Sequence, residues 1–243
     1  MRKILLLLGL VLIAVPSYAT PAFVGAAKST TSTSASPCTV TYAPTNGNFV
    51  VLAVYANANI TTTAASVGAT ITINASTAVL NDGAVYGQSW YGEVTSGSVT
   101  SFTFTPSGSV SYACFVAQYS GIATTSPADG VATRVTTTGA ISLTPTNGDL
   151  VVYINPQNGF AFTTSYGNAR ATATTANSLY LNDVLGSSGT QAPNGGAGDT
   201  SYICILAAFL PSAGGGGSGG GGFGGKAGIG GKAGFGFLHK VKQ

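Results

Sequence analysis

The chain has 243 residues, and only 6% of them are charged, whereas about a quarter is usual for soluble domains. It contains nine Lys and Arg residues, six Asp and Glu residues and one His, against 44% hydrophobic residues and 35 glycines. This composition excludes a charge-driven nucleic-acid binder, a coiled coil and a highly charged disordered protein, and it leaves few side chains for acid–base catalysis.

The first residues have the pattern of a Sec signal peptide over 1–19. A basic start at 1–3 precedes an apolar run at 4–15, and Ser17 and Ala19 are the small residues of a cleavage site before Thr20. The apolar run is too short to span a bilayer, which takes about 20 residues. We therefore expect no transmembrane segment, and an extracellular or cell-surface protein after cleavage near Ala19.

Short apolar or alternating runs follow a Ser/Thr-rich stretch. Residues 20–37 predict a flexible linker. From residue 38 onward, runs rich in Val, Ile, Thr, Tyr and Phe alternate with Asn-Gly, Asp-Gly and Pro turn signals. This pattern predicts strands at 48–56, 68–75, 84–93, 98–106, 110–120, 149–155 and 201–210. The expected fold is all-β, an antiparallel β-sandwich or jelly roll over 38–212.

An internal duplication divides this region into two halves. Residues 43–51 recur as 144–152 at an offset of 101, and the same offset aligns 80–82 with 181–183. Residues 111–117 then match 201–207. The repeats span 40–121 and 141–211. One sandwich of two pseudo-symmetric halves and two tandem small sandwiches both fit, and the size of the region favours one domain.

A series of motifs carries a resemblance to a known family. The motifs lie, in order, at residues 45–51, 89–91, 98–104, 117–121, 126–129 and 207–211. The series resembles a poorly characterised β-sandwich module of secreted, surface and phage-tail-like bacterial proteins, and covers about residues 40–212. Gln118 stands where the module usually has an acidic residue. The resemblance implies an extracellular setting, bacterial or phage-associated, and implies little about a ligand.

Residues 213–243 predict a disordered, Gly-rich tail, because so much glycine loses too much entropy to fold alone. The body 38–212 holds two arginines and all six acids, whereas the tail holds four lysines and no acid. We expect a flexible arm that makes contacts through aromatic and cationic side chains: Phe223, Lys226, Lys232, Phe235, Lys240 and Lys242.

Tyr86, Gln88 and Trp90 are candidates for a glycan-binding platform, because alternate residues of one strand share a face and an aromatic ring with amides suits sugars. The alternative is that Trp90 or Tyr91 fills the core. Asp82 and Asp183 are weak calcium candidates, since calcium takes oxygen ligands. We expect no catalytic residues and no other metal or cofactor.

Three cysteines in a secreted chain predict one disulfide and one cysteine left over. Cys114 and Cys204 occupy matching places in the two repeats, and Cys38 stands at the start of the first expected strand. Three pairings are open. Cys38–Cys204 is slightly preferred because the first and last strands of a sandwich often lie close together, and Cys114 can equally be a buried small hydrophobe.

The first functional hypothesis is a secreted, non-enzymatic structural or adhesive surface protein, which self-associates. Lysine often protects exposed strand edges, and none occurs from 29 to 225. The alternative is a glycan-binding module for a surface polysaccharide. A glycosidase ranks third because it needs a pair of carboxyl groups. We expect no specific nucleic-acid partner.

Overall fold

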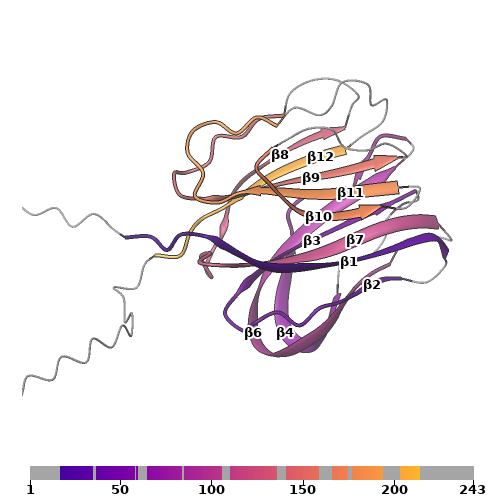
Figure 1. Cartoon of the computed structure of the whole chain (residues 1–243), viewed down its shortest axis with the longest axis horizontal. Helices are drawn as coiled ribbons and strands as arrows, with labels where there is room; N and C mark the ends of the chain where they lie inside the picture. The colour runs from indigo at the N-terminus through magenta and orange to yellow at the C-terminus, as the bar shows by residue number, and fades with distance from the viewer. Residues whose placement is uncertain are drawn as a thin grey trace, which may run out of the picture.

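A computed structural model of the chain shows two antiparallel sheets. The structure describes residues 17–34, 37–57, 59, 65–83, 85–105, 110–135, 141–158, 166–174, 177–193 and 203–213. All regular structure in these residues is β-strand, and the sheets pack as a β-sandwich (Figure 1). The predicted all-β sandwich is confirmed. Residues 1–16 of the predicted signal peptide and residues 214–243 of the predicted tail, with all six expected tail contacts, lie outside the described residues.

The first sheet is built from residues 22–120. Its strands are β1 (Ala22–Ser34), β2 (Cys38–Thr41), β3 (Phe49–Ala56), β4 (Ala65–Ala75), β5 (Leu80–Asn81), β6 (Tyr86–Phe104) and β7 (Val110–Ser120). Their order is β1-β7-β3-β6-β2, with β4 and β5 also paired to β6. The second sheet has the order β10-β11-β9-β12-β8. Its strands are β8 (Ala128–Val135), β9 (Leu150–Asn158), β10 (Asn168–Thr174), β11 (Asn177–Val184) and β12 (Ile203–Phe209).

Each half of the duplication forms one whole sheet. The order β1-β7-β3-β6-β4 of the first half corresponds strand by strand to β8-β12-β9-β11-β10 of the second. Two pseudo-symmetric halves therefore build the sandwich. The offset of 101 holds for β3 and β9 but fails for 80–82, because 181–183 lie in β11, which takes the place of β6 rather than of β5.

The predicted linker at 20–37 is wrong over most of its length. Residues 22–34 form β1, which pairs with β7. The second half explains why: β1 has a bulge at Val24 followed by Gly25, and β8 has a bulge at Asp129 followed by Gly130. The Ser/Thr-rich segment is thus the edge strand that begins the first repeat, and β8 is its counterpart in the second.

Two apolar cores form, one on each face of the first sheet. The core between the sheets includes Phe49, Phe115, Leu150 and Phe209. The second core lies on the outer face of the first sheet. The C-terminal part of β6, which pairs with β2, folds over this face and covers the core (Figure 1). All eight residues of β3 are buried because β3 contributes to both cores.

A disulfide joins Cys38 of β2 to Cys114 of β7. The preferred pairing of Cys38 with Cys204 is therefore wrong. Cys38 and Cys114 both point into the second core, whereas Cys204 belongs to an apolar cluster of the other sheet. The disulfide ties the folded-over end of the first sheet to its middle.

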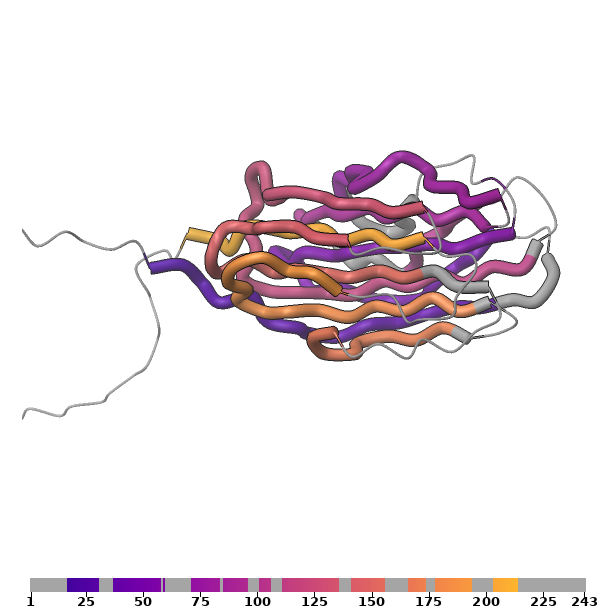
Figure 2. The backbone as a smooth tube through the Cα atoms, turned by 90° about the horizontal axis from the view of Figure 1, so that it is seen from above, coloured from indigo at the N-terminus to yellow at the C-terminus, as the bar shows by residue number. Residues whose placement is uncertain are grey.

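The described ends of the chain lie side by side (Figure 2). The amide of Ala19 donates to the carbonyl of Ser212 at 2.9 Å, and Tyr18 forms a bridge with Ala213. The expected cleavage before Thr20 thus falls just ahead of β1. No helix in the described part of the chain is long and apolar enough to cross a membrane.

Candidate functional site

The predicted platform of Tyr86, Gln88 and Trp90 is not on the surface. Trp90 is 0% exposed and packs against Phe104, and Gln88 is 8% exposed and donates to the carbonyl of Thr77 at 3.0 Å. Tyr86 is half-buried against the same second core. This face of β6 is covered by the folded-over strand ends, so the platform prediction is wrong.

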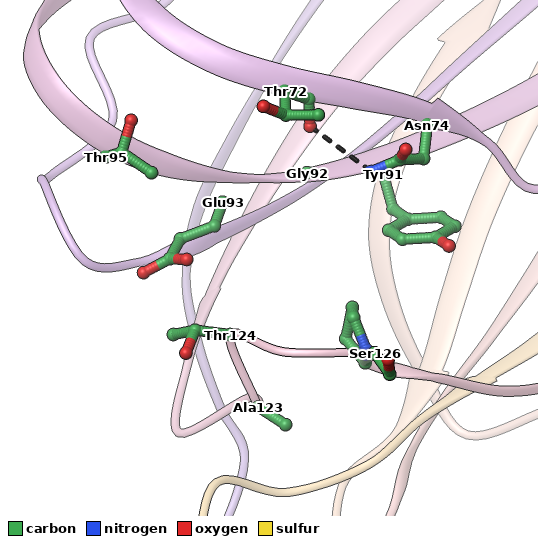
Figure 3. A pocket seen from close by; sticks show the side chains of 10 residues that line it. Thr72, Asn74, Tyr91, Gly92, Glu93, Thr95, Ala123, Thr124 and Ser126 are labelled. Atoms are coloured by element: carbon green, nitrogen blue, oxygen red, sulfur yellow. Dashed lines mark hydrogen bonds between the residues drawn. The ribbon is translucent and has the colours of Figure 1, made fainter.

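The opposite face of β6 presents Tyr91 and Glu93 in a hollow of about 410 Å³. In Figure 3, Thr72 and Asn74 of β4 border it on one side, and the segment between β7 and β8 borders it on the other. The residues that line it are Thr72, Asn74, Tyr91, Gly92, Glu93, Thr95, Ala123, Thr124, Ser126 and Pro127. We call this the first hollow. Its described lining combines hydroxyl and amide groups with the Tyr91 ring, Ala123 and Pro127, and Glu93 is its one charged side chain.

A second hollow, of about 210 Å³, lies on the other side of Tyr91. It separates the end of β4 from the start of β8. The residues that line it are Ala75, Ser76, Tyr91, Ala128, Asp129, Gly130, Val131, Ala207 and Phe209. The two hollows share Tyr91, and together we call them the Tyr91 groove.

The Tyr91 ring is held in place from the core side. It stacks on Phe49 with ring centroids 5.8 Å apart and an interplanar angle of 27°, and it contacts Phe209 at 5.2 Å. Across the first hollow, Ser126 has a positive φ of 48°, a conformation that costs about 1–3 kcal/mol and often occurs at functional sites. A fixed aromatic ring thus faces a strained, polar backbone segment.

On the other side of the sandwich, larger side chains occupy the equivalent place, and a hollow of about 170 Å³ remains between β1 and β10 beside Lys28 and Arg170. There, Phe23 takes the place of Ala128, and Asp183 that of Tyr91. The Arg170 guanidinium lies 4.5 Å from the centre of the Phe23 ring and forms an ion pair with Asp183 at 2.8 Å. The second hollow exists because Ala128 is small where the other half has phenylalanine.

Two acids meet beside the second hollow. Asp149, at the start of β9, is 0% exposed, and its carboxyl group lies in hydrogen-bonding contact with that of Asp129. Burial, followed by the contact with Asp129 and its negative charge, raises the pKa of Asp149 to about 7. The Thr146 amide donates to Asp129 at 2.7 Å, and this hydrogen bond lowers the pKa of Asp129.

The predicted calcium candidates, Asp82 and Asp183, make contacts within the protein. Asp82 accepts a hydrogen bond from the Val85 amide at 2.9 Å, and Asp183 is paired with Arg170. They lie in different sheets and are not brought together. Among the described residues, no group of three or more His, Cys, Asp or Glu side chains gathers at one point.

Cys204 is buried in the apolar cluster on the outer face of the second sheet, where its sulfur also contacts three polar side chains. Its sulfur lies 3.3 Å from Nη2 of Arg134, 3.2 Å from the Tyr153 hydroxyl and 3.6 Å from Nδ2 of Asn155. The second sheet has no described strand that corresponds to β2, the strand that carries Cys38. The matching positions of Cys114 and Cys204 therefore have different chemistry.

Comparison with known proteins found no matching family model, no similar curated protein and no similar solved structure. The resemblance to the secreted β-sandwich module therefore stays a prediction. The Tyr91 groove is therefore chosen as the candidate binding site from its geometry alone: two hollows that share one aromatic ring held by the core.

Proposed function

We propose that the protein is a secreted, non-enzymatic surface protein whose adhesive function is to bind a saccharide in the Tyr91 groove. The observation that carries this proposal is a fixed aromatic ring at the centre of a groove whose lining is rich in hydroxyl groups. The predicted signal peptide and the resemblance to secreted modules support the extracellular setting.

The lining of the groove suits sugars for a chemical reason. A saccharide offers many hydroxyl groups and flat C–H faces, and few charges. The hydroxyls of Thr72, Thr124 and Ser126 and the amide of Asn74 can each donate and accept hydrogen bonds. The exposed part of the Tyr91 ring can stack on a C–H face, and its contacts with the core hold it ready without a cost in ordering.

The carboxyl groups support binding rather than hydrolysis. Glycosidases place two carboxyl groups on either side of the bond that they cleave. Glu93 is the one carboxylate in the described lining of the first hollow, and Asp129 lies in the second hollow beyond Tyr91.

The test is a glycan array probed with the full secreted chain, followed by calorimetric titration of the best ligand. We expect Tyr91→Ala to weaken binding by about tenfold or more, which corresponds to about 1.4 kcal/mol. Asn74→Ala, at an exposed position, should weaken binding without affecting folding. Ala128→Phe, which copies Phe23 of the other half, should fill the second hollow and reduce binding of longer saccharides.

Tyr86→Ala is the matched control, because Tyr86 lies on the same strand but faces the second core. Its affinity should equal that of the original chain. Equal affinity in Tyr91→Ala and Asn74→Ala, or no ligand on the array, would contradict the proposal.

Self-assembly is a second candidate function, and the edge strand β8 favours it. Among the described strands β8 pairs only with β12, and it exposes Val131 (46%) and Thr133 on a strand without lysine. An exposed strand edge of this kind can pair with a second copy of the chain.

A further inference from the structure

Asp149 is a buried acid, and no Lys or Arg side chain of the described residues forms an ion pair with it. Its side chain is 0% exposed, and its described polar contacts are with the Asp129 carboxyl group and the Thr146 backbone. Burial of an uncompensated carboxylate is costly, so such a group normally has a partner. Two carboxyl groups in contact repel each other when both are charged, so a proton or a cation must lie between Asp149 and its neighbour.

Asp129 adds a second carboxylate at the same point. The bulge at the start of β8 turns it toward Asp149, and the two carboxyl groups are in contact. One oxygen of Asp129 accepts the Thr146 amide, while its side chain borders the second hollow and is exposed to solvent. The pair thus has one buried member and one member open to water.

The Lys and Arg side chains that the structure describes contact groups other than these two acids. Lys28 donates to the carbonyl of Thr172, Arg170 pairs with Asp183, and Arg134 contacts Cys204. The first half has no matching pair, since Asn48 stands at the position of Asp149 and Val24 at that of Asp129. The two acids therefore belong to the second half alone and are not part of the shared framework.

We propose that Asp129 and Asp149 bind a hard divalent cation of the calcium class. Both groups offer oxygen ligands only, which is what calcium prefers, and the hollow beside Asp129 leaves room for the waters that complete its shell. The cation would join the start of β8 to the start of β9 and fix the β8 wall of the Tyr91 groove.

The experiment measures thermal unfolding and calorimetric calcium binding of the full chain at pH 8, after removal of metals with EDTA. We expect added CaCl₂ to raise the Tm in a saturable way with a Kd of about 0.1–1 mM, the range of extracellular calcium modules. MgCl₂ should act more weakly because it demands a tighter octahedral shell.

Asp129→Asn removes an exposed carboxylate, so the chain should fold and bind calcium at least tenfold more weakly. Asp149→Asn copies Asn48 of the other half and should abolish the calcium response. Asp82→Asn is the control, and its response should equal that of the original chain. No heat of binding and no change in Tm at about 10 mM CaCl₂, ten times the upper end of that range, would overturn the proposal and leave a shared proton as the partner of Asp149.

Discussion

At the scale of single residues, the two halves show how one backbone position takes different chemistry. Tyr91 of β6 and Asp183 of β11 occupy equivalent places, yet one forms the centre of an open groove, whereas the other is buried and forms an ion pair with the partly exposed Arg170. The neighbouring exchange of Phe23 for Ala128 decides which side is open. Side-chain volume, rather than backbone geometry, creates the candidate site.

The raised pKa of Asp149 makes stability depend on pH in metal-free buffer. Its pKa is 3.8 when unperturbed and about 7 in the folded protein, so the folded state holds a proton that the unfolded state releases. Stability should therefore fall as the pH rises from 4 to 7, by at most about 1.4 kcal/mol per pH unit. The lowered pKa of Asp129 acts in the opposite direction, but only at more acidic pH.

Asp149→Asn should remove most of this slope and stabilise the protein at pH 8 by about 1–3 kcal/mol. Chemical denaturation in EDTA at pH 5 and pH 8 measures both effects. Asn48→Asp places an acid at the equivalent position without an acidic partner, and its slope should match that of the original chain. A slope that persists unchanged in Asp149→Asn would show that another group carries it.

At the scale of elements, the sequence predicts the apolar strands well and the polar edge strands poorly. β3, β7 and β12 fall where their apolar runs predict, because they are central strands buried on both faces. β1 is rich in Ser, Thr, Ala and Gly, and β8 begins with an Asp-Gly turn signal, yet both form strands because β7 and β12 offer edges to pair with. The order of strands in a sheet is not visible in a local pattern.

The sequence could not predict which face of β6 is open, because this also depends on the arrangement of strands. Alternation places Trp90 and Tyr91 on opposite faces, but both faces of the first sheet pack against apolar residues. Only the folding of β2 over one face shows that Trp90 is covered and that Tyr91 borders a groove.

The disulfide should contribute strongly to stability, because it closes a span of 76 residues. Constraint of the unfolded chain by a loop of this length is worth roughly 4 kcal/mol. Urea unfolding of Cys38→Ala/Cys114→Ala should show a loss of this order. Dithiothreitol should destabilise the original chain and leave the double variant unchanged, since the variant retains only Cys204. Equal stability of the oxidised and reduced original chain would contradict this prediction.

At the scale of the whole molecule, the sandwich has two unequal sides. Where β1 lies beside β10, Phe23, Lys28 and Arg170 occupy part of the space between the sheets and leave a hollow of about 170 Å³. Where β8 lies beside the end of β4, the Tyr91 groove remains open and the edge of β8 is exposed. Ligand binding and self-association would therefore both use the β8 side.

Light scattering of residues 20–243 tests self-association at this edge. We expect polymers, and Thr133→Lys should convert them to monomers because a charge on the edge opposes strand pairing. Thr41→Lys, at an exposed position of β2, should have no effect. A chain that ends at Ser212 should also polymerise if β8 is the contact, whereas polymers that require residues 213–243 would assign the contact to the tail. Monomers of the original chain at high concentration would contradict self-assembly.

The division of the sandwich into one sheet per repeat has a consequence for its origin. A single repeat would fold into a sheet with an uncovered apolar face, which only a second copy of the same sheet could cover. The chain therefore has the architecture of a homodimer whose subunits became joined in one polypeptide. The two halves are not identical: the first carries a disulfide and Phe23 at its flank, whereas the second has Ala128 at the equivalent place and the two acids Asp129 and Asp149.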